Sequence, residues 1–183
     1  MRYILIHGWG GGPNKDWFPW LAEELKKQGH EVLAPEMPST DEPTIEKWTA
    51  KVGKVVGVPD NETFFVGHSI GCQAILRYLQ TIDIRVAGAV FVAGWFNLKN
   101  LEDEETEKIA QPWIETPIDI GKIRSVLPKS TLVISDNDPY NCFEENKAKF
   151  TELGSDSIVI LNGDHLTAED GFAQFPQLLE IAK

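Results

Sequence analysis

Thr63-Phe64-Phe65-Val66-Gly67-His68-Ser69-Ile70-Gly71-Cys72-Gln73-Ala74-Ile75-Leu76 is the most informative stretch of this chain. Its first half is rich in β-branched and aromatic residues, which is typical of a buried strand. Its second half carries small and apolar residues at helical spacing, which predicts a helix. Between the two halves lies Gly-His-Ser-Ile-Gly, a Gly-x-Ser-x-Gly pattern centred on Ser69.

This arrangement has a chemical consequence for Ser69. A serine at a sharp strand-to-helix turn is held in a strained backbone conformation, with its hydroxyl exposed at the edge of the sheet. Gly67 and Gly71 lack a Cβ, so the strand and the helix can approach each other closely. The N-terminus of the helix favours negative charge that develops beside the serine. The pattern predicts a nucleophile; the alternative is a glycine-containing turn whose serine only caps the helix.

Short apolar runs alternate with helix-like segments along the rest of the chain. We expect strands at 2–6, 31–34, 86–92, 131–135 and 157–161, and helices at 17–28, 44–56, 120–126, 142–153 and 170–182, besides the strand and the helix that form the two halves of 63–76. Residues 35–43 are proline-rich and predict a loop, and residues 94–118 are expected to be irregular. Strands that alternate with helices predict right-handed crossovers and a parallel sheet covered on both faces.

Length and composition favour a single domain over residues 1–183. The formal net charge of −11 argues against nucleic acid and anionic membrane surfaces as partners. The two cysteines lie outside any metal-ligand spacing, which makes a reducing compartment the default. The apolar run at the N-terminus is too short for a signal peptide. We therefore expect a cytoplasmic protein; a protein partner is not indicated either way.

The glycine loop Gly8-Trp9-Gly10-Gly11-Gly12-Pro13 follows the first strand. A dinucleotide-binding Gly-x-Gly-x-x-Gly would need glycine where Pro13 stands, and a phosphate-binding loop would need Gly-Lys-Ser/Thr. A third interpretation is an oxyanion loop, in which the backbone N–H of Trp9 pairs with that of Ile70 to bind a tetrahedral oxyanion. The remaining alternative is a flexible turn with no ligand.

A nucleophilic serine needs a base, and the base needs an orienting carboxylate. His165 follows the sixth strand at its carboxyl end, the edge at which open parallel sheets bind ligands, so it is the preferred base. His68 precedes Ser69 and is expected to point away from it, in a structural role. Asp136 and Asp138 both leave the fifth strand, and either could orient the base or cap the next helix.

The order Ser69, Asp138, His165 matches the serine–acid–histidine order of α/β-hydrolases. More narrowly, the sequence resembles the small serine hydrolase family that includes retinoblastoma-binding protein nine and its bacterial relatives. The resemblance rests on Ile-Leu-Ile-His-Gly-Trp-Gly (4–10), Asp-Trp-Phe-Pro-Trp-Leu (16–21), Ala-Pro-Glu-Met-Pro (34–38), Gly-His-Ser-Ile-Gly (67–71), Gln-Pro-Trp (111–113), Ser-Asp-Asn-Asp-Pro (135–139) and Gly-Asp-His (163–165).

The resemblance implies a compact α/β-hydrolase fold, a three-layer sandwich whose six-stranded parallel sheet has the order 2-1-3-4-5-6. It also implies Ser69 as nucleophile, His165 as base and Asp138, rather than Asp136, as the acid. Activity on small ester-like substrates follows from the resemblance, and neither a cofactor nor a metal is implied. Thioesters and peptides would use the same catalytic residues and remain alternatives.

Residues 94–118 would lie over the serine and form a possible cap or lid. Trp95 and Phe96 could line a substrate pocket, or could simply cover the end of the sheet. The acidic run at 102–107 would disfavour anionic substrates if it lay near the pocket mouth. An alternative of another class is a hydrolase-fold interaction protein. A large exposed apolar patch around Trp95, Phe96 and Trp113, with the serine unreachable, would favour it.

Overall fold

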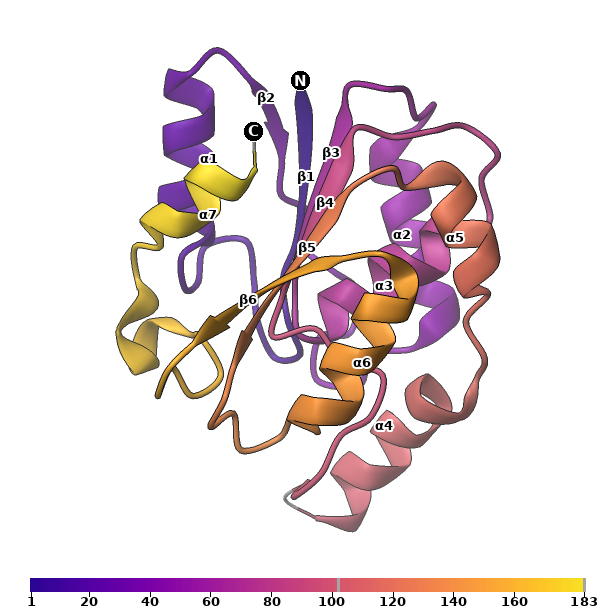
Figure 1. The fold of residues 1–183 in the computed structure, drawn as a ribbon, viewed down its shortest axis with the longest axis vertical. Helices are drawn as coiled ribbons and strands as arrows, with labels where there is room; N and C mark the ends of the chain where they lie inside the picture. The colour runs from indigo at the N-terminus through magenta and orange to yellow at the C-terminus, as the bar shows by residue number, and fades with distance from the viewer. Residues whose placement is uncertain (102, 183) are drawn as a thin grey trace.

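A six-stranded parallel sheet runs through the middle of the computed structural model, which describes residues 1–101 and 103–182 (Figure 1). The sheet order is β2-β1-β3-β4-β5-β6, as the resemblance implied. The strands are β1 (Arg2–Ile6), β2 (Glu31–Leu33), β3 (Thr63–His68), β4 (Gly88–Val92), β5 (Ser130–Ser135) and β6 (Asp156–Ile160). Because neighbouring strands are parallel, their carboxyl ends meet at one edge. Glu102 in the predicted cap and Lys183 at the end of the predicted domain lie outside the described residues.

Helices cover both faces of the sheet, as predicted (Figure 1). Alternate residues of β1 serve opposite faces: Tyr3 and Leu5 belong to one buried cluster, Ile4 and Ile6 to the other. The first cluster packs against α1 (Phe18–Lys27) and α7 (Pro176–Ile181). The second packs against α2 (Ile45–Val56), α3 (Ile70–Leu79), α5 (Ile120–Val126) and α6 (Phe143–Leu153). The sheet is therefore the middle layer of a three-layer sandwich.

The segment expected to be irregular contains a regular helix, α4 (Glu104–Glu115), so that prediction was wrong. Asp103 caps it, because its Oδ1 accepts a hydrogen bond from the backbone N–H of Thr106 at 2.8 Å. The acidic residues of the first turn then complement the positive end of the helix dipole. The acidic run was considered for its effect on anionic substrates, although it also carries this capping signal. In Figure 1, α4 lies at the end of the molecule where the strands terminate.

The prediction of a single helix over residues 170–182 was also wrong. The chain forms a short helical segment, η1 (Ala168–Phe172), and then α7. Gly171 has a φ of 95°, which a continuous right-handed helix does not allow. Pro176 begins α7, because proline is tolerated in the first turn of a helix but interrupts a helix interior. Within the part of the chain that the structure describes, no helix has the length and apolar character to cross a bilayer.

Candidate active site

Ser69 lies at the sharp turn between β3 and α3, with φ 52° and ψ −122°. A residue with a side chain seldom adopts this conformation, and the hydrogen bond from its N–H to the carbonyl of Val92, at 2.9 Å, helps to hold it. The Ser69 side chain makes no capping hydrogen bond to α3. The structure therefore excludes the alternative in which Ser69 only caps the helix. Instead the side chain lines a cavity at the carboxyl edge of the sheet.

Gly67 and Gly71 allow this turn because neighbouring backbone atoms lie too close to either position for a Cβ to fit. A Cβ on Gly71 would lie 2.6 Å from the carbonyl oxygen of His7 and would also collide with that of Ile6. A Cβ on Gly67 would lie 2.9 Å from the backbone nitrogen of Cys72. The first turn of α3 therefore packs directly on the end of β1. This contact brings the start of the glycine loop next to the serine turn.

His165 and Asp138 meet beside this turn. The Nδ1–H of His165 donates to Oδ2 of Asp138 at 2.8 Å, and the side chains are 20% and 1% exposed. The carboxylate of Asp136 has a different partner: its Oδ1 accepts a hydrogen bond from the N–H of Asn162 at 2.8 Å. Of the two aspartates left open by the residue pattern, Asp138 is thus the one in contact with His165. With Nδ1 protonated, Nε2 of His165 remains a free acceptor.

The loop that carries His165 is tightly wound and tied to the loop after β5. Positive φ values recur along it, at Asn162 (54°), Asp164 (46°) and Leu166 (61°). Asn137 bonds to this loop twice: its Oδ1 accepts from the N–H of Asp164 at 2.9 Å, and its Nδ2 donates to Oδ1 of Asp164 at 2.8 Å. Asn137 was not predicted as a site residue, because its only signal in the sequence is its place between the two aspartates.

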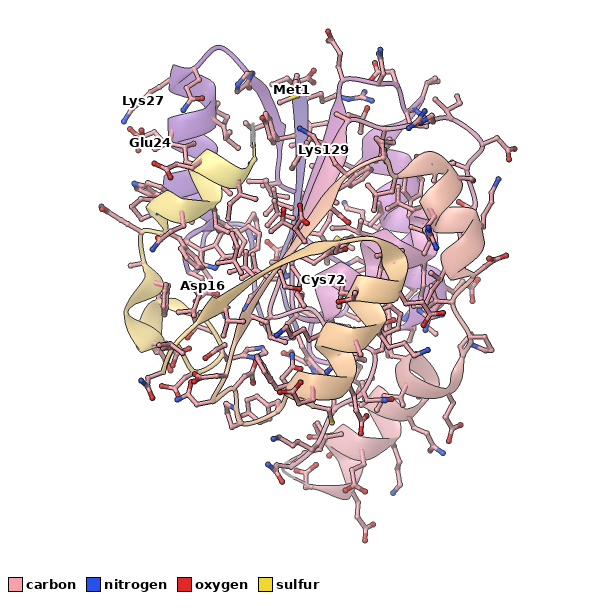
Figure 2. The ribbon with its side chains drawn as sticks, viewed as in Figure 1. Met1, Asp16, Glu24, Lys27, Cys72 and Lys129 are labelled. Atoms are coloured by element: carbon pink, nitrogen blue, oxygen red, sulfur yellow. The ribbon has the colours of Figure 1, made fainter. Side chains whose placement is uncertain are left out.

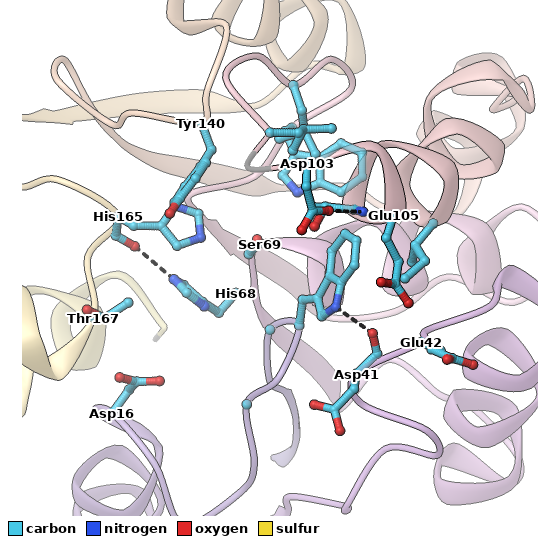
Figure 3. Close-up of a pocket in the computed structure, with 18 residues that line it drawn as sticks. Asp16, Asp41, Glu42, His68, Ser69, Asp103, Glu105, Tyr140, His165 and Thr167 are labelled. Atoms are coloured by element: carbon cyan, nitrogen blue, oxygen red, sulfur yellow. Dashed lines mark hydrogen bonds between the residues drawn. The ribbon is translucent and has the colours of Figure 1, made fainter.

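His68 does not point away from the site, so that expectation is corrected. Its Nε2–H donates to the carbonyl of His165 at 2.9 Å, and the two rings meet edge to face at 4.9 Å (Figure 3). The loop after β6 folds over the face of the sheet that His68 occupies, a contact that strand alternation alone does not reveal. Burial, followed by the neighbouring charge of His165, lowers the pKa of His68 to about 4. His68 is therefore neutral at pH 7 and supports the His165 loop.

His7 fixes the peptide group that precedes Trp9. The backbone N–H of Met37 donates to Nε2 of His7 at 3.1 Å, which leaves the proton on Nδ1, and this N–H donates to the carbonyl of Gly8 at 2.8 Å. Gly11 adds a second hydrogen bond to the same carbonyl. The Gly8–Trp9 peptide bond is trans, so its C=O and N–H point in opposite directions. Holding the carbonyl therefore sets the direction of the Trp9 N–H.

The two N–H groups expected to form an oxyanion hole are unpaired. Within the described chain, neither the N–H of Trp9 nor that of Ile70 donates a hydrogen bond. Ile70 opens α3, where the first N–H groups of a helix have no intrahelical acceptor. The Trp9 indole is anchored separately, because its Nε1–H donates to the carbonyl of Asp41 at 2.9 Å (Figure 3). Neither backbone donor is thus engaged by another group of the described chain.

The cavity beside Ser69 has a volume of about 480 Å³. It is lined by Gly8, Trp9, Gly11, Asp16, Asp41, Glu42, His68, Ser69, Trp95, Leu98, Leu101, Asp103, Glu105, Thr106, Ile109, Tyr140, His165 and Thr167. Of the two aromatic residues expected to form the pocket, Trp95 is present. Phe96 is not, which corrects the expectation: its ring packs on Phe150 at 5.2 Å, and its N–H donates to Oδ1 of Asn146.

The aromatic residues of the 94–118 segment do not form an exposed patch. Trp95 and Trp113 are each 1% exposed. The Nε1–H of Trp113 donates to the carbonyl of Pro43 at 3.0 Å, and its ring packs edge to face on Trp48. The exposed apolar surface that would favour an interaction protein is therefore not found at these two tryptophans.

Cys72, one turn beyond Ser69, lies in the interior of the molecule (Figure 2). Its Sγ–H donates to the carbonyl of Val92 at 3.4 Å, and burial raises the pKa of its thiol. A thiol that stays protonated is a poor nucleophile. Cys72 therefore has the properties of a core residue, as expected.

Comparison with known proteins shows the family of this chain. The family model described as serine hydrolase matches residues 3–182. The protein YdeN of Bacillus subtilis (strain 168) is 25% identical over 182 residues, covering 98% of this chain and 93% of YdeN. Serine hydrolase RBBP9 of Rattus norvegicus is 23% identical over 185 residues, covering 100% of this chain and 94% of RBBP9.

Solved structures share the fold. The crystal structure of the ydeN gene product from B. subtilis matches with a TM-score of 0.89 at 23% identity, covering 98% of this chain and 95% of that chain. A structure from a study of carboxylesterases of the thaumarchaeon Nitrososphaera gargenis matches with a TM-score of 0.71 at 14% identity, covering 98% of this chain and 87% of that chain. The architecture is that of the α/β-hydrolases.

Proposed function

The chain belongs to the serine hydrolase family, and on this basis we propose that it hydrolyses small carboxylic esters with Ser69 as nucleophile, His165 as base and Asp138 as orienting acid. One observation carries the proposal: His165, which forms a 2.8 Å hydrogen bond with Asp138, lines the same cavity as Ser69. The strained backbone at Ser69 adds support, because such strain is concentrated at functional sites.

The proposed reaction proceeds through an acyl-enzyme. Ser69 Oγ attacks the ester carbonyl while Nε2 of His165 takes its proton. His165 then returns that proton to the leaving alcohol, and a water molecule hydrolyses the acyl-enzyme by the same route. Asp138 keeps the proton of the imidazole on Nδ1 and stabilises the imidazolium that forms during each step.

The oxyanion of each tetrahedral intermediate would be held by the N–H groups of Trp9 and Ile70. Their lack of other partners in the described chain supports this role. Donors of this kind lower the barrier by about 3 kcal/mol each. The hydrogen bond from His7 to Gly8 would aim the Trp9 donor before the substrate arrives, so no reorganisation is needed during the reaction.

The 94–118 segment would serve as a cap within a single domain spanning the chain. Support comes from its described residues that line the cavity, which include Leu98, Leu101 and Ile109. These apolar side chains would contact a small acyl or leaving group. We propose esters, and not thioesters or amides, as the substrates because a structurally similar protein comes from a study of carboxylesterases.

Labelling with a fluorophosphonate, read by intact mass, tests the nucleophile. We expect one adduct on the wild type, one on the control Ser125→Ala, whose serine is exposed on α5, and none on Ser69→Ala. Turnover of a panel of esters, thioesters and amides should fall by about 10³-fold or more in Ser69→Ala with the fold intact. Persistent labelling or turnover in that variant would refute the assignment.

A further inference from the structure

The cavity beside Ser69 is strongly acidic. Five of its lining residues are carboxylates, on the loops after β1 and β2 and at the start of α4: Asp16, Asp41, Glu42, Asp103 and Glu105. No lysine or arginine is among the described residues that line it. None of the five carboxylates forms an ion pair with a lysine or arginine in the described chain. Their negative charge is therefore not balanced by a paired basic side chain of the described chain.

The histidines in the cavity do not offset this charge. His68 is neutral at pH 7, because burial lowers its pKa to about 4. His165 must act as a base in the proposed reaction and is therefore neutral before catalysis. The pKa of Asp103 is lowered by the backbone N–H of Thr106, so this carboxylate stays ionised. A substrate thus enters a field that attracts cations.

A second observation shows an unused binding group in the same cavity. Trp95 lines the cavity and is 1% exposed, yet its indole N–H has no hydrogen-bond partner in the described structure. A buried donor without a partner costs free energy unless a ligand satisfies it. Trp9 lines the same cavity, and the faces of aromatic rings bind ammonium groups favourably. The cavity therefore combines carboxylates with aromatic walls.

The position of Ser69 indicates which part of the substrate meets these carboxylates. Figure 3 shows His165 on one side of Ser69, and Asp41, Glu42, Asp103 and Glu105 on the other. His165 must reach the leaving group, because it delivers the proton to it. The acyl group therefore extends toward the four carboxylates.

We propose that the preferred substrates are esters whose acyl group carries an ammonium group a few bonds from the carbonyl. The carboxylates around the cavity attract the cation, and the ring of Trp9 packs against it. The indole N–H of Trp95 is a donor that an ester oxygen, but not an ammonium group, can satisfy. This proposal rests on the proposed ester hydrolysis at Ser69 and names the substrate class of that site.

Isosteric p-nitrophenyl esters provide the test. The cationic ester is 4-(trimethylammonio)butanoate, the neutral one is 5,5-dimethylhexanoate, which has carbon in place of nitrogen, and the anionic one is 4-sulfobutanoate. We expect kcat/KM for the cationic ester to exceed that for the neutral ester by about tenfold or more at low salt. The ratio should fall as ionic strength rises, because exposed charges are screened. The anionic ester should be the poorest substrate.

A matched pair of variants on α4 locates the effect. Glu105 lines the catalytic cavity, whereas Glu107, in the same first turn, lines a second cavity on the outer side of α4. Glu105→Gln should lower the cationic-to-neutral ratio about threefold, and Glu107→Gln should leave it at the wild-type value. Equal losses in the two variants would mean that only the net charge matters and would overturn the proposal.

The remaining outcomes separate the two proposals. A ratio near one with good turnover of the neutral ester would overturn the cation preference and leave ester hydrolysis standing. A preference seen only when the cation is in the leaving group, in acetylcholine compared with 3,3-dimethylbutyl acetate, would overturn the acyl assignment. Hydrolysis of none of these esters would overturn the proposed function itself.

Discussion

His7 shows how one side chain can set the direction of a backbone N–H, that of Trp9, which we propose as an oxyanion donor. Its two ring nitrogens bond to Met37 and to Gly8, so the imidazole is locked in one tautomer and one orientation. Leucine at this position would remove both hydrogen bonds, and asparagine would keep a donor close to the Nδ1 position. We expect kcat to fall about tenfold or more in His7→Leu and less in His7→Asn, with KM nearly unchanged in both.

Steady-state kinetics of the two variants, with thermal unfolding as a control for stability, test this role. A purely structural histidine would give losses of kcat that follow the losses of stability in the two variants. An equal kcat in His7→Leu and His7→Asn at equal stability would contradict the role of His7 in aiming the Trp9 N–H.

At the scale of elements, the loops after β5 and β6 form one unit through Asn137. Its side chain donates to and accepts from Asp164, next to His165. Asn137→Ala removes both hydrogen bonds, and His165 then loses part of its fixed position. We expect kcat to fall about tenfold, because small displacements of a catalytic group are costly.

In Asn137→Ala, KM should change less than kcat, since Asn137 does not line the cavity. Asn97→Ala, which removes an exposed hydrogen bond to Glu145, provides a matched control and should keep wild-type kcat. If both variants lost activity equally, the specific role of Asn137 would be refuted.

A buried cation ties the C-terminal end of helix α4 to α3. Arg77 is 1% exposed, and its Nη2 donates to the carbonyls of Trp113 at 2.8 Å and Thr116 at 3.0 Å. Lysine presents a point charge without the planar fork of arginine. Arg77→Lys should therefore destabilise the protein by about 2 kcal/mol, whereas Arg124→Lys, exposed on α5, should be neutral.

Urea unfolding of the two arginine variants measures this difference, and limited proteolysis within 94–118 shows whether α4 detaches. Rapid cleavage there in Arg77→Lys alone would support the attachment. Equal stability and equal protection in the two variants would show that the buried guanidinium does not hold α4.

At the scale of the whole molecule, the two buried histidines make stability depend on pH. Burial lowers the pKa of His68 to about 4 and also lowers that of His7, whereas both are near 6.5 in an unfolded chain. Between these values the unfolded state binds more protons than the folded state, so stability falls as the pH drops from 6.5 toward 4. The loss should be on the order of 2 kcal/mol by pH 4.5.

Urea midpoints measured at pH 7 and pH 4.5 test this dependence. His68→Gln keeps an amide donor near the carbonyl of His165 but cannot titrate, so it should show a smaller change between the two pH values. Asp16, Asp138 and His165 lie in the electrostatic surroundings of His68 and will contribute to the wild-type slope. An unchanged slope in His68→Gln would exclude His68 as the cause.

The sequence alone determined the order of the six strands and of most helices, because each of these carries its own local signal. The short apolar runs, the helical patterns, the glycine loop and the Gly-His-Ser-Ile-Gly turn are readable within windows of a few residues. The right-handed crossover rule then predicts a parallel sheet with its carboxyl ends at one edge. Ser69, His165 and one of two aspartates were predicted to lie at that edge, and the family resemblance favoured Asp138. The structure brings His165 and Asp138 into contact at a cavity that Ser69 lines.

Only the tertiary structure decided which side chains face the cavity. His68 was expected to turn away and Phe96 to line the cavity, yet His68 contacts the His165 loop and Phe96 packs on Phe150. Both outcomes depend on contacts between segments far apart in the chain, which no local pattern encodes. That Asp41 and Glu105 line one cavity likewise depends on contacts between distant segments. The physical reason is that strands and helices follow from local backbone preferences, whereas the lining of a cavity depends on long-range packing.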